Sequence, residues 1–398
     1  MPSGLYIHVP FCIHRCIYCA FYLEELGSGP IADRLGRSVD RPGYVEALAR
    51  ELEGLPSGFT PETVYVGGGT PTELSLGDLR QMMALLGRRM DASVIREYTV
   101  EANPGTLNRE KAELLLASGV NRVSLGLQAM DNATLDFLSR VHRVEEALAT
   151  YRMLRECGFA NINVDLIICI PGRGDEQLNR ELDQLIALEP DHVSCYGLEF
   201  DAGAPLTDLL EQGHFTAMEE DVAAGQYELS VDRLEAAGLH QYEISNFSRP
   251  GFESRHNLNY WNAGEYLGCG PSASSHVAGR RYKNLPDLKG WQAHLAAGES
   301  PIVEEEQLPA EAKARESLML ALRQKAGITT SELKQRTGFD LVQLLGGAIQ
   351  DWIDHGYMEW AGEHLRLTRA GMLASDALFV DIVAAPETTS GRRVPRHH

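Results

Sequence analysis

The sequence predicts an α/β fold, a partial (β/α)6 barrel that is followed by a small, mainly helical C-terminal domain. Strand-like and helix-like segments alternate six times between residues 5 and 198. Chemically distinctive residues follow several of these strands, as in parallel barrels, where functional groups collect at the carboxyl ends of the strands. Beyond residue 310 the pattern changes to short helices and one hairpin. An open, doubly wound sheet is the alternative architecture for the first part.

Several of the predicted strands are rich in β-branched or aromatic residues, and segments with helical spacing alternate with the strands. In the first helix, for example, Tyr44, Leu48 and Leu52 recur every four positions, and Gly119 is a typical stop for the third helix. We expect strands at residues 5–9, 63–66, 97–100, 122–127, 161–168 and 192–198. We expect helices at residues 43–55, 76–90, 108–118, 132–139, 145–157, 175–188 and 215–237.

Three cysteines, Cys12, Cys16 and Cys19, follow the first strand at C-x3-C-x2-C spacing. Thiolates are soft ligands that suit iron–sulfur clusters, and three on one loop can hold three irons of a 4Fe–4S cube. The fourth iron then has no protein ligand and can bind another molecule. Two alternatives remain open: a zinc site completed by His14, and a chance cluster of buried thiols.

Polar and glycine residues stand at the ends of the next strands. A Gly-Gly-Gly-Thr-Pro run occupies residues 67–71, Glu101 ends the third strand, Gln128 ends the fourth, and Asp165 lies within the fifth. Glycines let a backbone approach a ligand closely, and their amides can receive a carboxylate. For each acidic residue alone, a surface position is the commoner outcome. We expect Glu101, Gln128 and Asp165 to lie close together only because the strands of a parallel barrel bring their carboxyl ends together.

The composition narrows the class of protein. The chain has 398 residues and a formal net charge of -20, which argues against a nucleic-acid-binding surface. No apolar run reaches the length of a membrane span, and Cys12 comes too early for a signal peptide. An open iron–sulfur cluster needs reducing conditions, so we expect a cytoplasmic protein. Peripheral membrane contact and oligomerisation stay open.

The cysteine loop resembles that of the radical S-adenosylmethionine (SAM) superfamily, and the longer pattern resembles its HemN and HemW branch. The resemblance implies a 4Fe–4S cluster on the three cysteines, with SAM bound to the free iron. It implies contacts to SAM from Tyr6, Tyr18, Gly68, Gly69, Thr70 and Glu101, and to a second SAM from Gln128, Arg140 and Asp165. An Arg-Val-His run at residues 140–142 matches the Gly-Arg-x-His run of the family, except that Ser139 replaces the glycine.

The His-Asn-Leu-Asn-Tyr-Trp run at residues 256–261 matches the H-N-x-x-Y-W signature of the HemW branch. By this resemblance His256 is a haem ligand, and Tyr260 and Trp261 stack on the macrocycle, since imidazole binds haem iron and aromatic rings pack on flat surfaces. The alternative for His256 is a hydrogen-bonded structural histidine. Cys269 is a conceivable second haem ligand, although close glycine packing explains its surroundings better.

The sequence predicts that the chain divides into four regions. Residues 1–285 are expected to form the barrel with its haem-signature extension, and residues 286–309 a connector. Residues 310–380 are expected to form a winged-helix-like domain, of a kind usual at the C-terminus in this family, and residues 381–398 a disordered tail. Within the domain, a Thr-Thr-Ser-Glu run at residues 329–332 predicts a capping box, and Gly338 ends that helix.

The resemblance leaves three functions open. The first is a haem chaperone that binds the cluster and SAM and transfers haem to apo-haemoproteins, with an electron donor for the cluster. The second is oxygen-independent coproporphyrinogen III oxidation in porphyrin biosynthesis, and the third is a HemN-like radical SAM methyltransferase. The chain begins just before the cluster loop, Ala20 and Phe21 follow Cys19 where oxidases have a further cysteine, and the 256–261 signature is present. These features favour the chaperone, whereas Gln128, Arg140 and Asp165 keep radical chemistry open.

Overall fold

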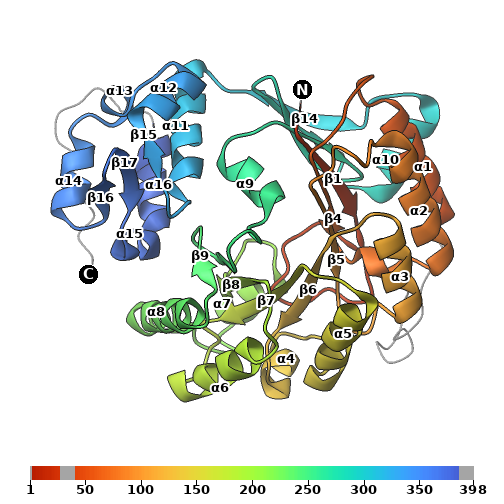
Figure 1. Cartoon of the computed structure of the whole chain (residues 1–398), viewed down its shortest axis with the longest axis horizontal. Helices are drawn as coiled ribbons and strands as arrows, with labels where there is room; N and C mark the ends of the chain where they lie inside the picture. Colours follow the sequence, from red (N-terminus) through yellow and green to blue (C-terminus); the bar gives the residue numbers. More distant parts are fainter. Residues whose placement is uncertain (1, 27–40, 385–398) are drawn as a thin grey trace. The chain divides into compact units, whose positions relative to one another are not determined.

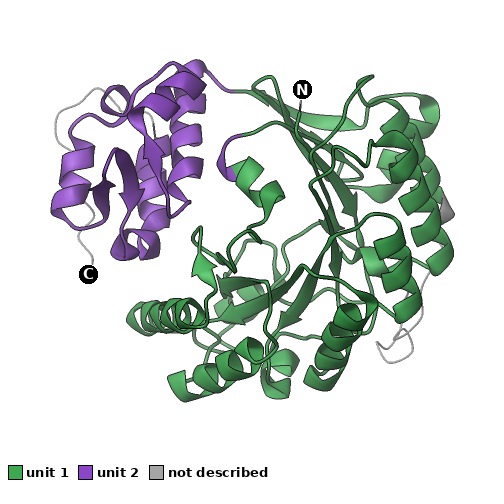
Figure 2. Cartoon of the chain, in the orientation of Figure 1, with its two compact units in different colours: residues 1–260, 264–307 green, residues 261–263, 308–398 purple. Residues whose placement is uncertain are grey.

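The computed structural model describes residues 2–26 and 41–384, so the part of the predicted tail from residue 385 lies outside the described residues. The chain divides into two compact units (Figure 2). The first comprises Met1–Tyr260 and Gly264–Gln307, and the second Trp261–Ala263 and Leu308–His398. The predicted haem signature therefore crosses from one unit to the other at Trp261.

Six parallel strands form the centre of the first unit, adjacent in the order in which they occur in the chain. Helices follow them and cover one side of the curved sheet (Figure 1). This arrangement confirms the predicted α/β fold. The strands are β1 (Gly4–Val9), β4 (Thr63–Gly68), β5 (Glu97–Ala102), β6 (Arg122–Gln128), β7 (Ile162–Ile168) and β8 (His192–Gly197). The helices are α1 (Pro42–Glu53), α2 (Leu76–Arg89), α3 (Arg109–Ala117), α4 (Asn132–Phe137), α5 (Val144–Cys157) and α6 (Asp175–Ile186).

The two faces of these strands differ in polarity because successive side chains point to opposite sides. On β4, Val64 and Val66 are fully buried in the hydrophobic core, whereas Thr63 and Tyr65 alternate with them. The other five strands follow the same rule. Their apolar residues join one core, and residues such as Glu101, Asn163 and His192 lie on the opposite face. The barrel interior is therefore polar, which suits a ligand chamber better than a packed core.

Shorter strands extend the sheet at both edges. β11 (Tyr266–Cys269) runs parallel to β1 and is followed by antiparallel β12 (Ser274–Val277), β13 (Arg280–Asn284) and β14 (Ile302–Gln307). Beyond β8 lie β10 (Asn246–Ser248) and β9 (His240–Gln241). The remaining helices of this unit are α7 (Pro205–Glu211), α8 (Glu220–Ala236), α9 (Arg255–Trp261) and α10 (Leu288–Ala297), so the helix expected from residue 215 begins at Glu220.

The expected connector at residues 286–309 is corrected by the structure, because it contains α10 and β14. Helix α10 buries Trp291 completely against Tyr44 of α1, with ring centroids 5.6 Å apart. Strand β14 pairs with β13 although all six of its residues are exposed. An exposed, Glu-rich strand has no buried face to produce an alternating pattern, and this is why its sequence resembles a linker.

The second unit contains α11 (Ala310–Leu322), α12 (Thr330–Thr337), α13 (Leu341–Leu345), α14 (Ala348–Asp354), α15 (Arg369–Leu373) and α16 (Ser375–Val383), with a sheet of β15 (Ile328–Thr329), β17 (His364–Leu367) and β16 (Met358–Ala361). Thr329 and Glu332 form the predicted capping box, and Gly338 ends α12 with a φ of 83°. Residues 381–383, assigned to the tail, belong to α16. None of the described helices has the length and apolarity needed to span a membrane.

Candidate functional site

The cysteine loop follows β1 directly, at the carboxyl end of the sheet. Cys12 ends the two-residue strand β2 (Phe11–Cys12), which pairs with β3 (Glu24–Glu25). The amide of Cys19 donates to the Cys16 carbonyl at 3.0 Å, and the Arg15 guanidinium donates to the Cys19 carbonyl at 3.1 Å. Burial raises the pKa of the Cys12 thiol to about 12. Cys16 and Cys19 therefore lie on one internally bonded turn, a few residues after the strand that ends at Cys12.

A chain of hydrogen bonds ties this turn to the ends of the neighbouring strands. The Thr70 hydroxyl lies 3.4 Å from Cys12 Sγ and accepts from Asn103 Nδ2 at 2.7 Å. Asn103 Oδ1 accepts from Arg140 at 2.7 Å, and a second Arg140 nitrogen lies 3.4 Å from Cys16 Sγ. Arg140 also donates to the Gly126 carbonyl at 2.9 Å. Residues after β4 and β5, the end of β6 and the loop after α4 are thereby joined to two of the three cysteines.

Asn103 is the member of this chain that was not predicted as a site residue. Its signal was available, since it stands two residues after Glu101 and directly after β5. The sequence does not indicate that Asn103 contacts Thr70 and Arg140, because these partners lie 33 and 37 positions away along the chain.

The glycine run after β4 is required by close packing. A Cβ at Gly67 would lie 2.6 Å from the Glu101 carboxyl, one at Gly68 2.4 Å from the His8 ring, and one at Gly69 2.8 Å from the Phe11 backbone. Gly68 also has a φ of 102°, which disfavours other residues. A bulky residue at Gly68 would thus disturb His8 as well as any ligand.

The amides of Gly68, Gly69 and Thr70 have hydrogen-bond acceptors within the chain, and the acceptor of Gly68 is itself a carboxylate. Gly68 donates to Glu101, Gly69 to the Val9 carbonyl at 2.9 Å, and Thr70 to the Phe11 carbonyl at 2.7 Å. The run therefore attaches the end of β4 to the segment that leads into Cys12.

Glu101 reaches across the barrel interior to β4. One carboxyl oxygen accepts from the Tyr65 hydroxyl at 2.6 Å and the other from the Gly68 amide at 3.0 Å. Burial raises the pKa of this carboxyl to about 7, the Tyr65 hydrogen bond opposes that rise, and the charge of Asp165 adds to it. Glu101 can thus change protonation near neutral pH.

The remaining predicted SAM residues lie in the same end of the barrel or border it. Gln128 ends β6 with a φ of 69°, and Asp165 accepts from Asn163 at 2.7 Å. The Tyr6 hydroxyl is bonded to His8 at 3.0 Å, while Tyr18 packs against a small cluster that includes Leu138, Ile167 and Ile170. Arg140, which is predicted to contact a second SAM, has hydrogen-bond contacts with Cys16, Asn103 and Gly126.

The residues present fit an iron–sulfur cube better than a zinc ion. A zinc site needs four ligands around one ion, and this loop offers three cysteines and His14 for it, whereas a cube with an open iron needs only the three thiolates. His14, the fourth ligand of the zinc alternative, has its ring nitrogens 3.2 Å from Glu25 and 3.3 Å from Ser139. A guanidinium beside Cys16 and a hydroxyl beside Cys12 also suit anionic sulfur.

His256 lies at the opposite, amino-terminal end of the strands. Its Nδ1 is 2.9 Å from the Thr63 hydroxyl and its Nε2 is 2.8 Å from the Tyr260 hydroxyl. The residue is 1% exposed, and its ring stacks on Tyr65 at 5.2 Å. Burial lowers the pKa of the imidazole to about 3, so the ring is neutral. Both nitrogens have partners, and an axial bond to haem iron would require that one of these hydrogen bonds be broken.

The other predicted haem residues take part in local packing. Tyr260 contacts the Tyr266 ring at 4.6 Å, and the Arg323 guanidinium lies 4.5 Å from the Trp261 ring within the second unit. Cys269 is buried at the end of β11, and Gly268 before it leaves no room for a Cβ against the Ser274 carbonyl. Close glycine packing thus explains the surroundings of Cys269.

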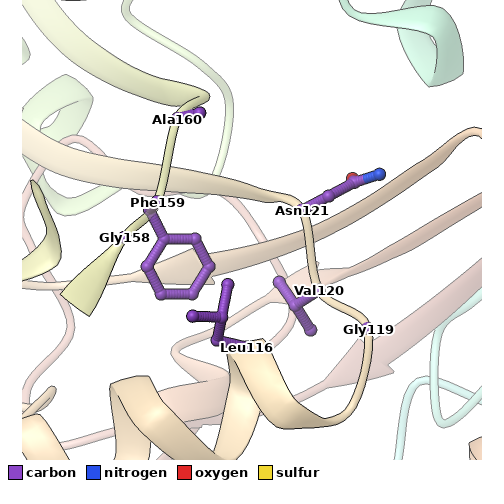
Figure 3. Close-up of a pocket in the computed structure, with 7 residues that line it drawn as sticks. All are labelled: Leu116, Gly119, Val120, Asn121, Gly158, Phe159 and Ala160. Atoms are coloured by element: carbon purple, nitrogen blue, oxygen red, sulfur yellow. The ribbon is translucent and has the colours of Figure 1, made fainter.

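A shallow pocket lies in the loops that precede β6 and β7. The side chains of Leu116, Val120 and Phe159 gather in it, whereas Asn121 points away (Figure 3). Because these loops enter the amino ends of the strands, the pocket lies away from the cysteine loop. It carries no titratable group and does not belong to the candidate site.

Comparison with protein families matches two parts of the chain. The model described as the radical SAM superfamily matches residues 6–185, and that of the HemN C-terminal domain matches residues 308–374. Among solved structures, the radical SAM enzyme coproporphyrinogen III oxidase (HemN) from Escherichia coli has a TM-score of 0.78 and 21% identity over 96% of this chain and 90% of that one. At this identity the likeness shows the fold alone.

Curated relatives match nearly the whole chain. The heme chaperone HemW of Lactococcus lactis is 32% identical over 95% of this chain and 96% of its own length. The heme chaperone HemW of Mycobacterium tuberculosis is 35% identical over 95% of this chain and 94% of its own length. With both domain matches and these relatives, the chain belongs to the HemW family of the radical SAM superfamily.

Proposed function

We propose that this protein is a haem chaperone that holds a 4Fe–4S cluster on Cys12, Cys16 and Cys19, binds SAM beside it, and passes haem to apo-haemoproteins. The observation that carries the cluster and SAM part is the hydrogen-bond chain from Cys12 through Thr70, Asn103 and Arg140 to Cys16. It fixes two sulfur ligands to the strand ends at which barrel chemistry collects.

In this proposal each residue has a defined task. The three thiolates bind three irons, and a bound cluster supplies one-electron chemistry and an open iron for the amino and carboxylate groups of SAM. Arg140 offsets negative charge on the sulfur of Cys16, and Thr70 contacts that of Cys12. Glu101, held by Tyr65, presents a carboxyl to a polar ligand in the barrel. An electron donor and a reducing, cytoplasmic location complete the proposal.

The haem part rests on the relatives that are named heme chaperone HemW. Haem is then the cargo and apo-haemoproteins are the acceptors. The predicted ligand His256 has no ring nitrogen without a partner, so we assign it a structural task and leave the axial ligand to another residue. Oxygen-independent coproporphyrinogen oxidation is the competing function that the same site chemistry allows.

Anaerobic reconstitution tests this proposal, with iron content, haem titration by Soret absorbance and coproporphyrinogen decarboxylation measured in parallel. We expect about four irons per chain, because a cube with three cysteine ligands carries four. Cys16→Ala should lose the cluster, whereas Cys157→Ala, a thiol on α5, should keep it. Haem binding without decarboxylation supports the chaperone. An intact cluster in Cys16→Ala overturns the cluster assignment, and useful decarboxylation by the wild type replaces the chaperone with the oxidase.

A further inference from the structure

Ser139 ends helix α4 in a conformation that favours glycine. Its φ is 55°, in the left-handed region. The Arg140 amide donates to the Leu135 carbonyl at 2.8 Å and the Ser139 amide to the Asp136 carbonyl at 3.0 Å. These two bonds form a Schellman motif, whose left-handed position is usually occupied by glycine. The family resemblance places glycine here too, so the serine carries a conformational penalty that the helix end does not require.

The Ser139 hydroxyl lies against the cysteine loop. It accepts from the Ile17 amide at 3.0 Å and is 3.3 Å from His14 Nε2. His14 Nδ1 is 3.2 Å from a Glu25 carboxyl oxygen, and the same oxygen accepts from the Arg15 amide at 2.8 Å. These bonds are mutually consistent if Ser139 donates to His14 and His14 donates to Glu25. They hold residues 14–17 of the loop from two sides.

The adjacent residues Ser139 and Arg140 therefore contact the cysteine loop at different atoms. Arg140 reaches the sulfur of Cys16, while Ser139 holds the backbone of Ile17, the residue after it. Glycine at position 139 would keep the helix end and the arginine but leave the Ile17 amide without this acceptor. A strained residue that persists beside a ligand loop points to a task that compensates for the strain.

We propose that Ser139 is a positioning residue for the iron–sulfur cluster, whose hydroxyl fixes the backbone between Cys16 and Cys19 and so slows loss of the cluster. This inference rests on the proposed cluster and adds a residue outside the cysteine motif to its support. It predicts that stability of the protein and retention of the cluster respond differently to substitutions at this position.

Three variants separate the hydroxyl from the backbone conformation. Ser139→Gly removes the hydroxyl and the left-handed penalty, and Ser139→Ala removes only the hydroxyl. Ser118→Ala is the control, since that hydroxyl donates to the Leu114 carbonyl in the last turn of the adjoining helix α3, away from the cysteine loop. Each is reconstituted anaerobically, and the rate of iron loss to a chelator is followed beside the melting temperature of the cluster-free protein.

We expect Ser139→Gly and Ser139→Ala to lose iron about five- to tenfold faster than wild type, the change that corresponds to one lost hydrogen bond. Ser139→Gly should melt higher than Ser139→Ala when cluster-free, because only alanine keeps the penalty. Ser118→Ala should lose iron at the wild-type rate.

Iron retention in Ser139→Gly equal to that of wild type would overturn the inference, because the residue would then only end the helix. Faster loss in Ser118→Ala as well would do the same, since the effect would be one of general stability. Absence of a cluster in the wild type is a different result. It would reject the proposed function itself and is read from the wild-type iron content alone.

Discussion

Asn103 holds two parts of the candidate site with one amide group. Its nitrogen donates to Thr70 and its oxygen accepts from Arg140. Asn121 makes the same kind of bridge elsewhere in the barrel, accepting from the Tyr98 amide at 2.8 Å and donating to the Arg96 carbonyl at 3.1 Å. The effects of replacing Asn103 and Asn121 by alanine can therefore be compared directly.

We expect Asn103→Ala to lower the free energy of unfolding by about 1–3 kcal/mol, because it leaves buried partners unsatisfied. Asn121→Ala should lower it less, because Asn121 is exposed and water can replace its hydrogen bonds. Only Asn103→Ala should also weaken SAM binding and reduce cluster iron, measured by calorimetry and iron content after reconstitution. Equal SAM affinity and iron in the two variants would show that the bridge to Thr70 and Arg140 has no part in the site.

Helix α9 is bonded to residues at the amino-terminal ends of β4 and β5. The Glu97 carboxylate at the start of β5 accepts from the amides of Arg255 and His256 at 2.8 and 3.1 Å. His256 then contacts Thr63 and stacks on Tyr65, whose hydroxyl donates to Glu101. Contacts through Tyr65 thus connect His256 of the haem signature to Glu101, which is predicted to bind SAM. His256 thereby attaches helix α9 to strand β4.

We expect His256→Ala to lower the melting temperature and to weaken SAM binding through Tyr65, with cluster iron unchanged. His192→Ala is the matched control, since His192 is fully buried and its ring nitrogens contact Asn163 at 2.6 Å and Tyr242 at 2.8 Å. Haem titration decides between the two roles of His256. Loss of haem binding in His256→Ala with a wild-type melting temperature, and no such loss in His192→Ala, would restore the axial-ligand assignment.

In the first unit, Glu51 connects helix α1 to the strands β11 and β13, which extend the sheet beyond β1. Its carboxylate accepts from the Gly270 amide at 2.7 Å, from Asn284 at 2.6 Å and from the Trp291 indole at 3.2 Å. Burial raises the pKa of this carboxyl to about 7, and the three donors oppose the rise. One side chain of α1 thereby connects the barrel to β11, β13 and α10.

The raised pKa of Glu51 predicts the sign of a pH effect. The folded state binds more protons than the unfolded state between about pH 4.5 and 7, so the contribution of Glu51 to stability is lost as pH rises through this range. Buried His8, with a pKa lowered to about 4, acts in the opposite direction, so wild type and Glu51→Gln must be compared. We expect the stability of wild type relative to the variant to fall by at most about 3 kcal/mol between pH 5 and 8. Urea unfolding of cluster-free protein measures it, and a constant difference across this range would contradict the assignment.

The six strands and the place of the cysteines and polar residues at their ends were predictable from the sequence alone, whereas the order of the strands stayed open between a partial barrel and a doubly wound sheet. Periodicity and strand-end position are local properties, and in a parallel barrel they suffice to bring Cys12, Thr70 and Glu101 to one end. The capping box of α12 was likewise predictable, because both of its partners lie within four residues.

The hydrogen-bond partners of these groups follow from the tertiary structure and not from the local sequence. The amides of Gly68 and Gly69 are bonded to other parts of the chain, Ser139 reaches a loop 122 positions away, and His256 meets Thr63 across 193 positions. Strand β14 has no apolar face and so left no pattern to detect. Residues so far apart in the sequence become hydrogen-bond partners only when the strands assemble into the curved sheet, and the local spacing of residues does not indicate these pairs.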